Sequence, residues 1–397
     1  MKNFCLKIYA ALLALLPIMS GYAGIASVDL GTIILFLWGC VCALAIGNLK
    51  VVLPRGYLAF LFFSLICTTI ATAKVPLGII LFVVNVILAL NYTKLQYVLK
   101  VYSFAVYTAC LLFLVQEVLF STTGYRPSGL LPWIPIVYED ISDAYKLSLL
   151  IADRSSSFFL EPAYFVEFLF PFIAIKLFSI NTKSRMEAIA VSFVVIFVRS
   201  GTGALLLMII WGLWFFISSF KKRAKIFVAI VFISALAVIV TYDSSISSLY
   251  SRVQELDLER GISGESSSGF IRFYRGYLLY AELPLVNKLF GASSDMIDHL
   301  IGVNYYFSDN KNLTFLNGAQ SLLIYYGFFS FVLYMRHLLL YCYKVRVEVI
   351  VLAICCIYLM LSESFFLTSR LFLCTIFICL ISQQGKNELL INAVRKL

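Results

Sequence analysis

Long runs of apolar residues without charge dominate this sequence and leave few folds open to it. A helix of about 20 apolar residues spans a hydrocarbon layer, and in lipid every backbone polar group needs a partner within its own segment. Continuous runs also exclude the alternating pattern of a β-barrel. Only 13% of the residues are charged, against about 25% in soluble domains. We therefore expect an all-α, polytopic transmembrane bundle of about twelve helices, at residues 8–26, 30–48, 56–73, 75–92, 101–120, 157–177, 187–199, 203–220, 226–241, 316–335, 347–366 and 367–382.

Basic residues indicate how these runs cross the membrane. With the N-terminus in the cytoplasm, 19 of the 31 Lys and Arg residues lie on that side in short loops or tails, but only 3 of the 21 Asp and Glu residues do. Because short cytoplasmic loops collect positive charge, we expect both termini to be cytoplasmic. The same rule accounts for most of the net charge of +10, so no nucleic-acid partner is expected.

This orientation divides the chain into five parts. Apolar helices occupy residues 1–120, 157–241 and 316–397, and the last of these parts ends in a cytoplasmic tail. Residues 121–156 and 242–315 are outer loops, of which the second is large, polar and expected to be partly helical. The ten cysteines lie in or beside apolar runs and show neither a disulfide framework nor a metal-binding spacing.

Ionisable groups at helix ends are costly in a membrane, so each is a candidate for function. In residues 154–172, Arg154 precedes Glu161 and Glu167, which lie on an otherwise apolar helix. Arg154 is suited to bind an anion, and Glu161 is suited to act as a general acid or base. The alternative is a helix-capping ion pair with a glutamate that reaches toward water.

A second candidate is the turn at residues 198–206, where Arg199 precedes Gly201 and Gly203. Free N–H groups and the helix dipole favour an anion at a helix start, so this turn suits a phosphate. The alternative is a plain hairpin turn with an interfacial arginine.

The third candidate lies in the large polar loop. Arg272 and Arg275 are three residues apart and would share one face of a helix. Two guanidiniums suit a diphosphate, because arginine binds phosphate oxygens in a bidentate manner. Tyr274 and Tyr277 supply flat surfaces that stack on sugars or lipid headgroups. A basic amphipathic helix on the membrane surface is the alternative.

The fourth candidate, residues 312–330, returns the chain to the membrane. Asn317 and Gln320 can hydrogen-bond a polar ligand there, but helix packing explains the composition of this stretch better. A short polar turn nearby holds Glu363 and Arg370, which are candidates to pair with each other. The sequence has no nucleotide-binding motif or histidine cluster, so no cofactor or metal is expected.

These places, in this order, resemble motifs of the Wzy-type O-antigen and capsular polysaccharide polymerases, which are related to O-antigen ligases. The resemblance is carried by Arg154 with Glu161-Pro162, the turn Arg199 to Gly203, Arg272 followed by Pro284 and Gly291, and the stretch Asn317 to Gly327. The ligases have a histidine directly before the corresponding asparagine. Leu316 occupies that position here, which favours a polymerase over a ligase.

The resemblance implies a GT-C-type membrane glycosyltransferase with a large periplasmic loop, in the bacterial inner membrane. It would transfer a glycan from one undecaprenyl-diphosphate carrier to a second carrier-linked repeat unit, in O-antigen or other lipopolysaccharide biosynthesis. A chain-length regulator is an expected partner from the family alone. A lipid-linked oligosaccharide flippase, another membrane transporter and an O-antigen ligase remain alternatives.

The resemblance also implies roles for the candidate residues. Glu161 would be the base, with its pKa raised by partial burial, and Arg154 would orient the site. The diphosphate and glycan would be held by Arg199, Arg272, Arg275, Tyr274, Tyr277 and Asn317.

Overall fold

The structure is a computed structural model and describes residues 2–25, 28–47, 55–72, 77–131, 133–136, 155–179, 181–217, 274–303, 316–342 and 346–394. Over these ranges the regular structure is helical, and extended pairing is limited to the isolated bridges Tyr22–Ile136 and Ile25–Val28. The predicted all-α class is therefore confirmed for the described part of the chain.

Long helices of the described part match eleven of the predicted apolar runs, and the expected helix at 226–241 lies outside that part. By length and composition, three of these helices, α1, α5 and α17, can each cross a membrane, and shorter apolar segments lie in α2, α3, α4, α9, α18 and α19. Their bounds are α1 Lys2–Met19, α2 Leu30–Ile46, α3 Arg55–Thr72, α4 Leu77–Tyr92, α5 Leu95–Thr123, α7 Pro162–Leu177, α8 Thr182–Phe197, α9 Gly201–Ile217, α17 Gly318–Cys342, α18 Val347–Ser362 and α19 Ser369–Val394.

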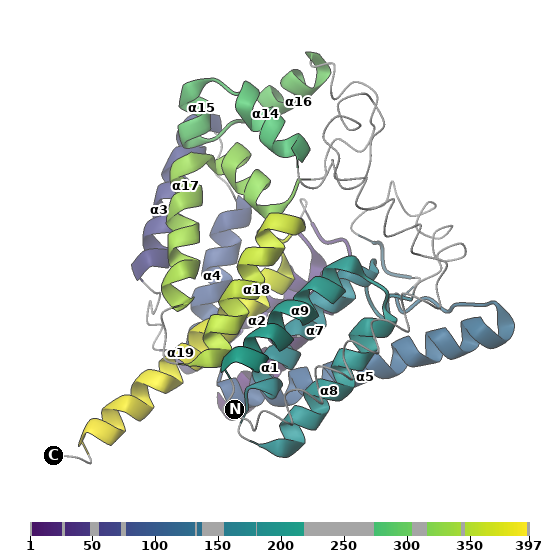
Figure 1. Ribbon diagram of the computed structural model, residues 1–397. Coiled ribbons are helices and arrows are strands. Elements are labelled where there is room, and N and C mark those ends of the chain that lie inside the picture. Colours follow the sequence, from purple (N-terminus) through teal and green to yellow (C-terminus); the bar gives the residue numbers. More distant parts are fainter. Residues whose placement is uncertain are drawn as a thin grey trace.

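Three short helices represent the described part of the large polar loop: α14 Gly276–Glu282, α15 Leu285–Phe290 and α16 Ser294–Val303. We call residues 274–303 the cap. Its apolar side chains form a small core of their own with two residues of the α17 segment, Leu316 and Ile324. In Figure 1 the cap lies at the top of the view, against the start of α17, while α1 begins and α19 ends toward the bottom.

Two glycines let the cap approach α17 closely. Gly327 has φ 81° and interrupts α17, and a Cβ there would lie 2.3 Å from the Leu289 carbonyl oxygen. Gly291 has φ 100°, and a Cβ there would lie 2.4 Å from the Tyr325 carbonyl oxygen. Both positions need a conformation and a proximity that only glycine permits. Gly291 and Gly327, which belong to the motifs singled out in the sequence, thus have a packing role in this fold.

An aromatic cluster fixes α5, α7 and α19 against one another. The ring of Tyr102 on α5 lies 5.2 Å from that of Phe168 on α7 and 5.1 Å from that of Phe377 on α19. The Tyr102 hydroxyl also donates a hydrogen bond to the Phe168 carbonyl oxygen. Since aromatic pairs have preferred geometries, this cluster sets how α7 is rotated toward α19.

Candidate functional site

Polar side chains from several helices meet at one end of the bundle, which we call the polar end. Helices α2, α7, α9, α17 and α19 begin there, and α18 ends there. The Thr202 hydroxyl at the start of α9 donates a hydrogen bond to the Glu363 carboxylate, directly after α18. Arg370 at the start of α19 pairs with Glu167 on α7, with 2.9 Å between Nη1 and Oε2.

The Glu167–Arg370 ion pair is buried, with side-chain exposures of 1% and 9%. The guanidinium carbon of Arg370 lies 3.7 Å from the centre of the Tyr164 ring, a cation–π contact. The expected Glu363–Arg370 pair is therefore wrong, since each residue has a different partner. The reason is local: Glu363 caps α18, whereas Arg370 lies in the first turn of α19, beyond a sharp turn at Leu367.

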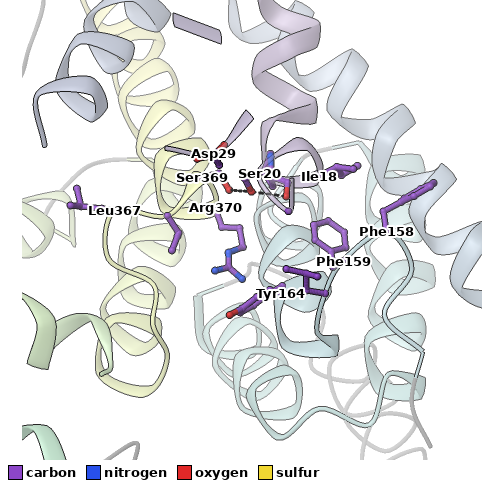
Figure 2. Close-up of a pocket in the computed structure, with 13 residues that line it drawn as sticks. Ile18, Ser20, Asp29, Phe158, Phe159, Tyr164, Leu367, Ser369 and Arg370 are labelled. Atoms are coloured by element: carbon purple, nitrogen blue, oxygen red, sulfur yellow. Dashed lines mark hydrogen bonds between the residues drawn. The ribbon is translucent and has the colours of Figure 1, made fainter. Parts of the chain in front are cut away.

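A cavity of about 190 Å³ opens beside this ion pair, between residues of α1, α7 and α19. Figure 2 shows Arg370 extending from the α19 turn toward Tyr164, with Asp29 and two serines nearby. These serines, Ser20 and Ser369, hydrogen-bond each other with 2.6 Å between their oxygens. A second cavity of about 130 Å³ is also lined by Asp29 and Ser369, so the two cavities adjoin.

Asp29 is a residue that the sequence analysis missed. Its carboxylate caps α2, accepting hydrogen bonds from the backbone N–H of Thr32 at 2.8 Å and from the Thr32 hydroxyl at 2.7 Å. Burial raises the pKa of Asp29, while these hydrogen bonds oppose the shift. A carboxyl group with a raised pKa in a cleft is a candidate general base. One signal was available, because Asp29 is the only acidic residue before Glu117.

The structure corrects one expectation for Glu161. This residue is the N-cap of α7 and makes no side-chain capping hydrogen bond, and it is exposed rather than partly buried. Pro162 explains this position, because its fixed φ favours the first turn of a helix and leaves the preceding residue outside it. Arg154, the expected partner in the site, lies outside the described residues.

Strained backbone marks three turns at the polar end. In the described ranges, the non-glycine residues with positive φ are Ser157 at 56°, Arg199 at 55° and Leu367 at 56°. They precede α7, α9 and α19 respectively. Left-handed backbone costs about 1–2 kcal/mol at such residues, and strain of this kind clusters at functional sites. Arg199 itself is exposed, and its N–H donates to the Ile196 carbonyl oxygen at 3.2 Å.

Three of the residues expected to bind the diphosphate and glycan, two tyrosines and one arginine, lie in the cap. Tyr274 and Tyr277 are exposed, whereas Arg275 is buried. Burial lowers the pKa of Arg275, although a guanidinium remains charged at neutral pH. Arg272 lies outside the described residues, so the expected shared face of the two arginines stays a prediction.

Asn317 has a structural role at the start of α17. Its Oδ1 accepts the Gln320 N–H at 2.8 Å, and Gln320 Oε1 accepts the Asn317 N–H at 3.0 Å, which is a reciprocal capping box. The Asn317 amide also donates to the Leu361 carbonyl oxygen at 2.9 Å, and its side chain hydrogen-bonds that of Tyr277. Asn317 thus joins α17, α18 and the cap.

Among the described residues, no group of three or more His, Cys, Asp or Glu side chains has a metal-binding arrangement. Comparison of the chain with protein-family models, curated proteins and solved structures finds no match. The fold and the polar end therefore define a coarse class: a protein of apolar helices, compatible with a membrane, that has a polar cavity beside a buried ion pair at one end.

Proposed function

We propose that this chain is a membrane glycosyltransferase that joins undecaprenyl-diphosphate-linked repeat units, a polymerase of the Wzy type that its motifs resemble. The observation that carries the proposal is the placement of Asp29 and the buried Glu167–Arg370 pair beside one cavity, at the end of an apolar bundle where α9 begins directly after Arg199 and Ser200. The proposal includes a site on the periplasmic face of a bacterial inner membrane, with both termini cytoplasmic.

The leaving group in this reaction is a lipid diphosphate, on which negative charge develops as the glycosidic bond breaks. Fixed guanidiniums stabilise such charge, and they do so most strongly where water is excluded. Arg199 at the start of α9 and Arg275 in the cap are proposed to hold the diphosphate, together with Arg272. Arg370 joins them as a new candidate because it lines the cavity, where Glu167 fixes its orientation.

The acceptor is a sugar hydroxyl of the second repeat unit. Its oxygen attacks the anomeric carbon of the donor glycan, the bond from that carbon to the diphosphate oxygen breaks, and the hydroxyl proton passes to a carboxylate. Asp29 and Glu161 are the candidate bases. Asp29 suits the role better on two counts, because it lines the cavity and because burial raises its pKa toward neutrality.

A transporter, such as a flippase for the same lipid-linked units, is the second candidate function. The observation that favours it is the buried Glu167–Arg370 pair, because ionisable pairs inside helix bundles are typical of transport pathways. The two functions predict different losses in cells. Without a polymerase, single repeat units still reach the surface, whereas without a flippase they remain inside.

The test is a gel of surface polysaccharide from cells that lack this chain. We expect the ladder to collapse to single repeat units and to be restored by the wild type. Arg199→Ala, Arg272→Ala and Arg275→Ala should each reach the membrane without restoring it. Arg336→Ala is the matched control, an exposed arginine on the second half of α17, and should restore the ladder. An unchanged ladder in the deletion strain would overturn the proposal, and loss of all surface units would favour the flippase.

A further inference from the structure

A larger cavity, of about 1160 Å³, lies at the end of the bundle opposite the polar end. It is bordered by the starts of α5, α8 and α18 and by the ends of α7 and α9. Its charged lining residues in the described part of the chain are Lys100, Lys176, Arg185, Arg346 and Glu348, and we call this cavity the basic basin.

Positive charge exceeds negative charge in the basic basin. Lys176 pairs with Glu187 at 2.8 Å, and Arg346 Nε lies 3.7 Å from Glu348 Oε2. Lys100 is exposed on α5. Arg185 donates from Nε to the Ser179 carbonyl oxygen at 2.7 Å, just beyond the end of α7. Four basic side chains thus line the basin against one lining carboxylate and one neighbouring carboxylate.

Helix direction adds to this field. Three helices begin at the rim, and a helix start presents N–H groups and partial positive charge. The N-caps of α5 and α18, Lys94 and Arg346, make no side-chain capping hydrogen bond. The ends of α7 and α9 carry the opposite partial charge, and at α7 it is offset by Lys176 in the last turn and by the Arg185 bond to Ser179. An anion is therefore favoured inside the basin.

We propose that the basic basin binds the phosphate headgroup of an anionic phospholipid from the leaflet at that end of the bundle. Polar side chains that can hydrogen-bond the headgroup, Gln96, Ser103 and Ser184, line the same space. Apolar side chains such as Leu99 and Trp214 suit the start of the acyl chains. Basic pockets between membrane helices recognise lipid headgroups in this way. This site is independent of the proposed glycosyl transfer.

The test is a binding titration with purified full-length protein in phosphatidylcholine nanodiscs, using fluorescent phosphatidylglycerol as the probe. The double variant Lys100→Gln/Arg346→Gln should bind about 25-fold more weakly, about fivefold for each basic residue removed near an anionic headgroup. Lys100→Arg keeps the charge and should bind like the wild type. The matched control is Lys183→Gln, an exposed cation in the first turn of α8 that does not line the basin, and it should change binding less than twofold.

Three competitors separate the sources of phosphate. We expect unlabelled phosphatidylglycerol to displace the probe, and phosphatidylcholine or inorganic phosphate at the same concentration to leave it bound. Equal competition by phosphatidylcholine would overturn recognition of an anion, and equal competition by inorganic phosphate would overturn the lipid source. Weaker binding by Lys100→Arg, equal to that of the double variant, would also contradict the electrostatic account. Unfolding temperatures in phosphatidylcholine alone check that each variant is folded.

Discussion

Single residues at the polar end hold unfavourable backbone geometry in place. Ser157 shows how this is done, because Gln116 accepts its N–H at 2.9 Å and donates to its carbonyl oxygen at 3.2 Å. The Ser157 hydroxyl also donates to the Ala109 carbonyl oxygen at 2.7 Å. Such bonds offset the cost of positive φ and keep the turn before α7 in one conformation. At Arg199 the same geometry carries a charged side chain, so strain and function can be separated there by mutation.

Replacing Arg199 by glycine tests that separation. Glycine adopts φ 55° without the side-chain clash, so Arg199→Gly should raise the free energy of unfolding by about 1 kcal/mol. Loss of the guanidinium should nevertheless lower polymerisation at least tenfold, as expected for one charge-assisted bond of about 1.5–3 kcal/mol. Denaturant unfolding in detergent and gel analysis of polymer length measure the two effects. A more stable protein with full activity would remove Arg199 from the site.

Asp29→Asn separates capping from chemistry. Asparagine caps helices as well as aspartate does, so stability should change by less than about 0.5 kcal/mol, whereas Asp29→Ala should cost about 1 kcal/mol. If Asp29 is the base, Asp29→Asn should lower the rate about 100-fold or more. Glu161→Gln tests the other candidate base and should keep most activity if Asp29 is the base. The reverse pattern, with Asp29→Asn active and Glu161→Gln inactive, would assign the base to Glu161.

The pH dependence of the rate is a further expectation for Asp29. Burial raises its pKa, and the base must be ionised to accept a proton. Activity should therefore fall as the pH drops through this raised pKa, at a higher pH than an ordinary aspartate would give. A pH–rate profile of the wild type measures this, and an acid limb at the position of an ordinary aspartate would contradict the role.

Between elements, the Glu167–Arg370 pair is a buried ionic contact that joins α7 to α19. Removing one partner leaves a buried charge, so Glu167→Gln should destabilise the protein by about 3–5 kcal/mol. Replacing both, as in Glu167→Leu/Arg370→Met, should recover much of that loss, because no buried charge remains. Denaturant unfolding of the single and double variants measures the difference. Equal stability of Glu167→Gln and the wild type would mean that the pair contributes little.

Docking of the cap on α17 depends on Gly327. An added methyl group would meet the Leu289 carbonyl oxygen at 2.3 Å in a backbone conformation that L-residues rarely adopt. Gly327→Ala should therefore cost at least about 1–3 kcal/mol and make the cap more sensitive to protease. The control is Gly212→Ala in α9, where nothing lies within 4 Å of the added methyl group and a gain of about 0.5–1 kcal/mol is expected. Similar protease sensitivity of both variants would contradict the docking role.

At the scale of the whole molecule, the apolar runs predicted eleven described helices but placed their ends less well. Helix α5 begins at Leu95 rather than at residue 101, because a helix continues through Lys100 while its charged head reaches water. The same reason extends α17 past Arg336. Apolarity marks where lipid contacts a helix, and backbone hydrogen bonding continues beyond that point.

The candidate site was predictable in its residue types and much less in its contacts. The Asn317–Gln320 cap is local and follows from the spacing of the two residues. The Glu167–Arg370 pair and the place of Asp29 beside the cavity depend on how helices from distant parts of the chain are rotated against one another. Periodicity and charge in a single sequence do not fix such rotations.

The most direct test of the proposed polymerase function is a reconstituted reaction with purified protein and undecaprenyl-diphosphate-linked repeat units in liposomes. We expect a ladder of joined units, with one carrier diphosphate released for each unit added, and loss of both products in Asp29→Asn and Arg199→Gly. Movement of the lipid-linked units across the bilayer without any elongation would contradict it and would identify a transporter.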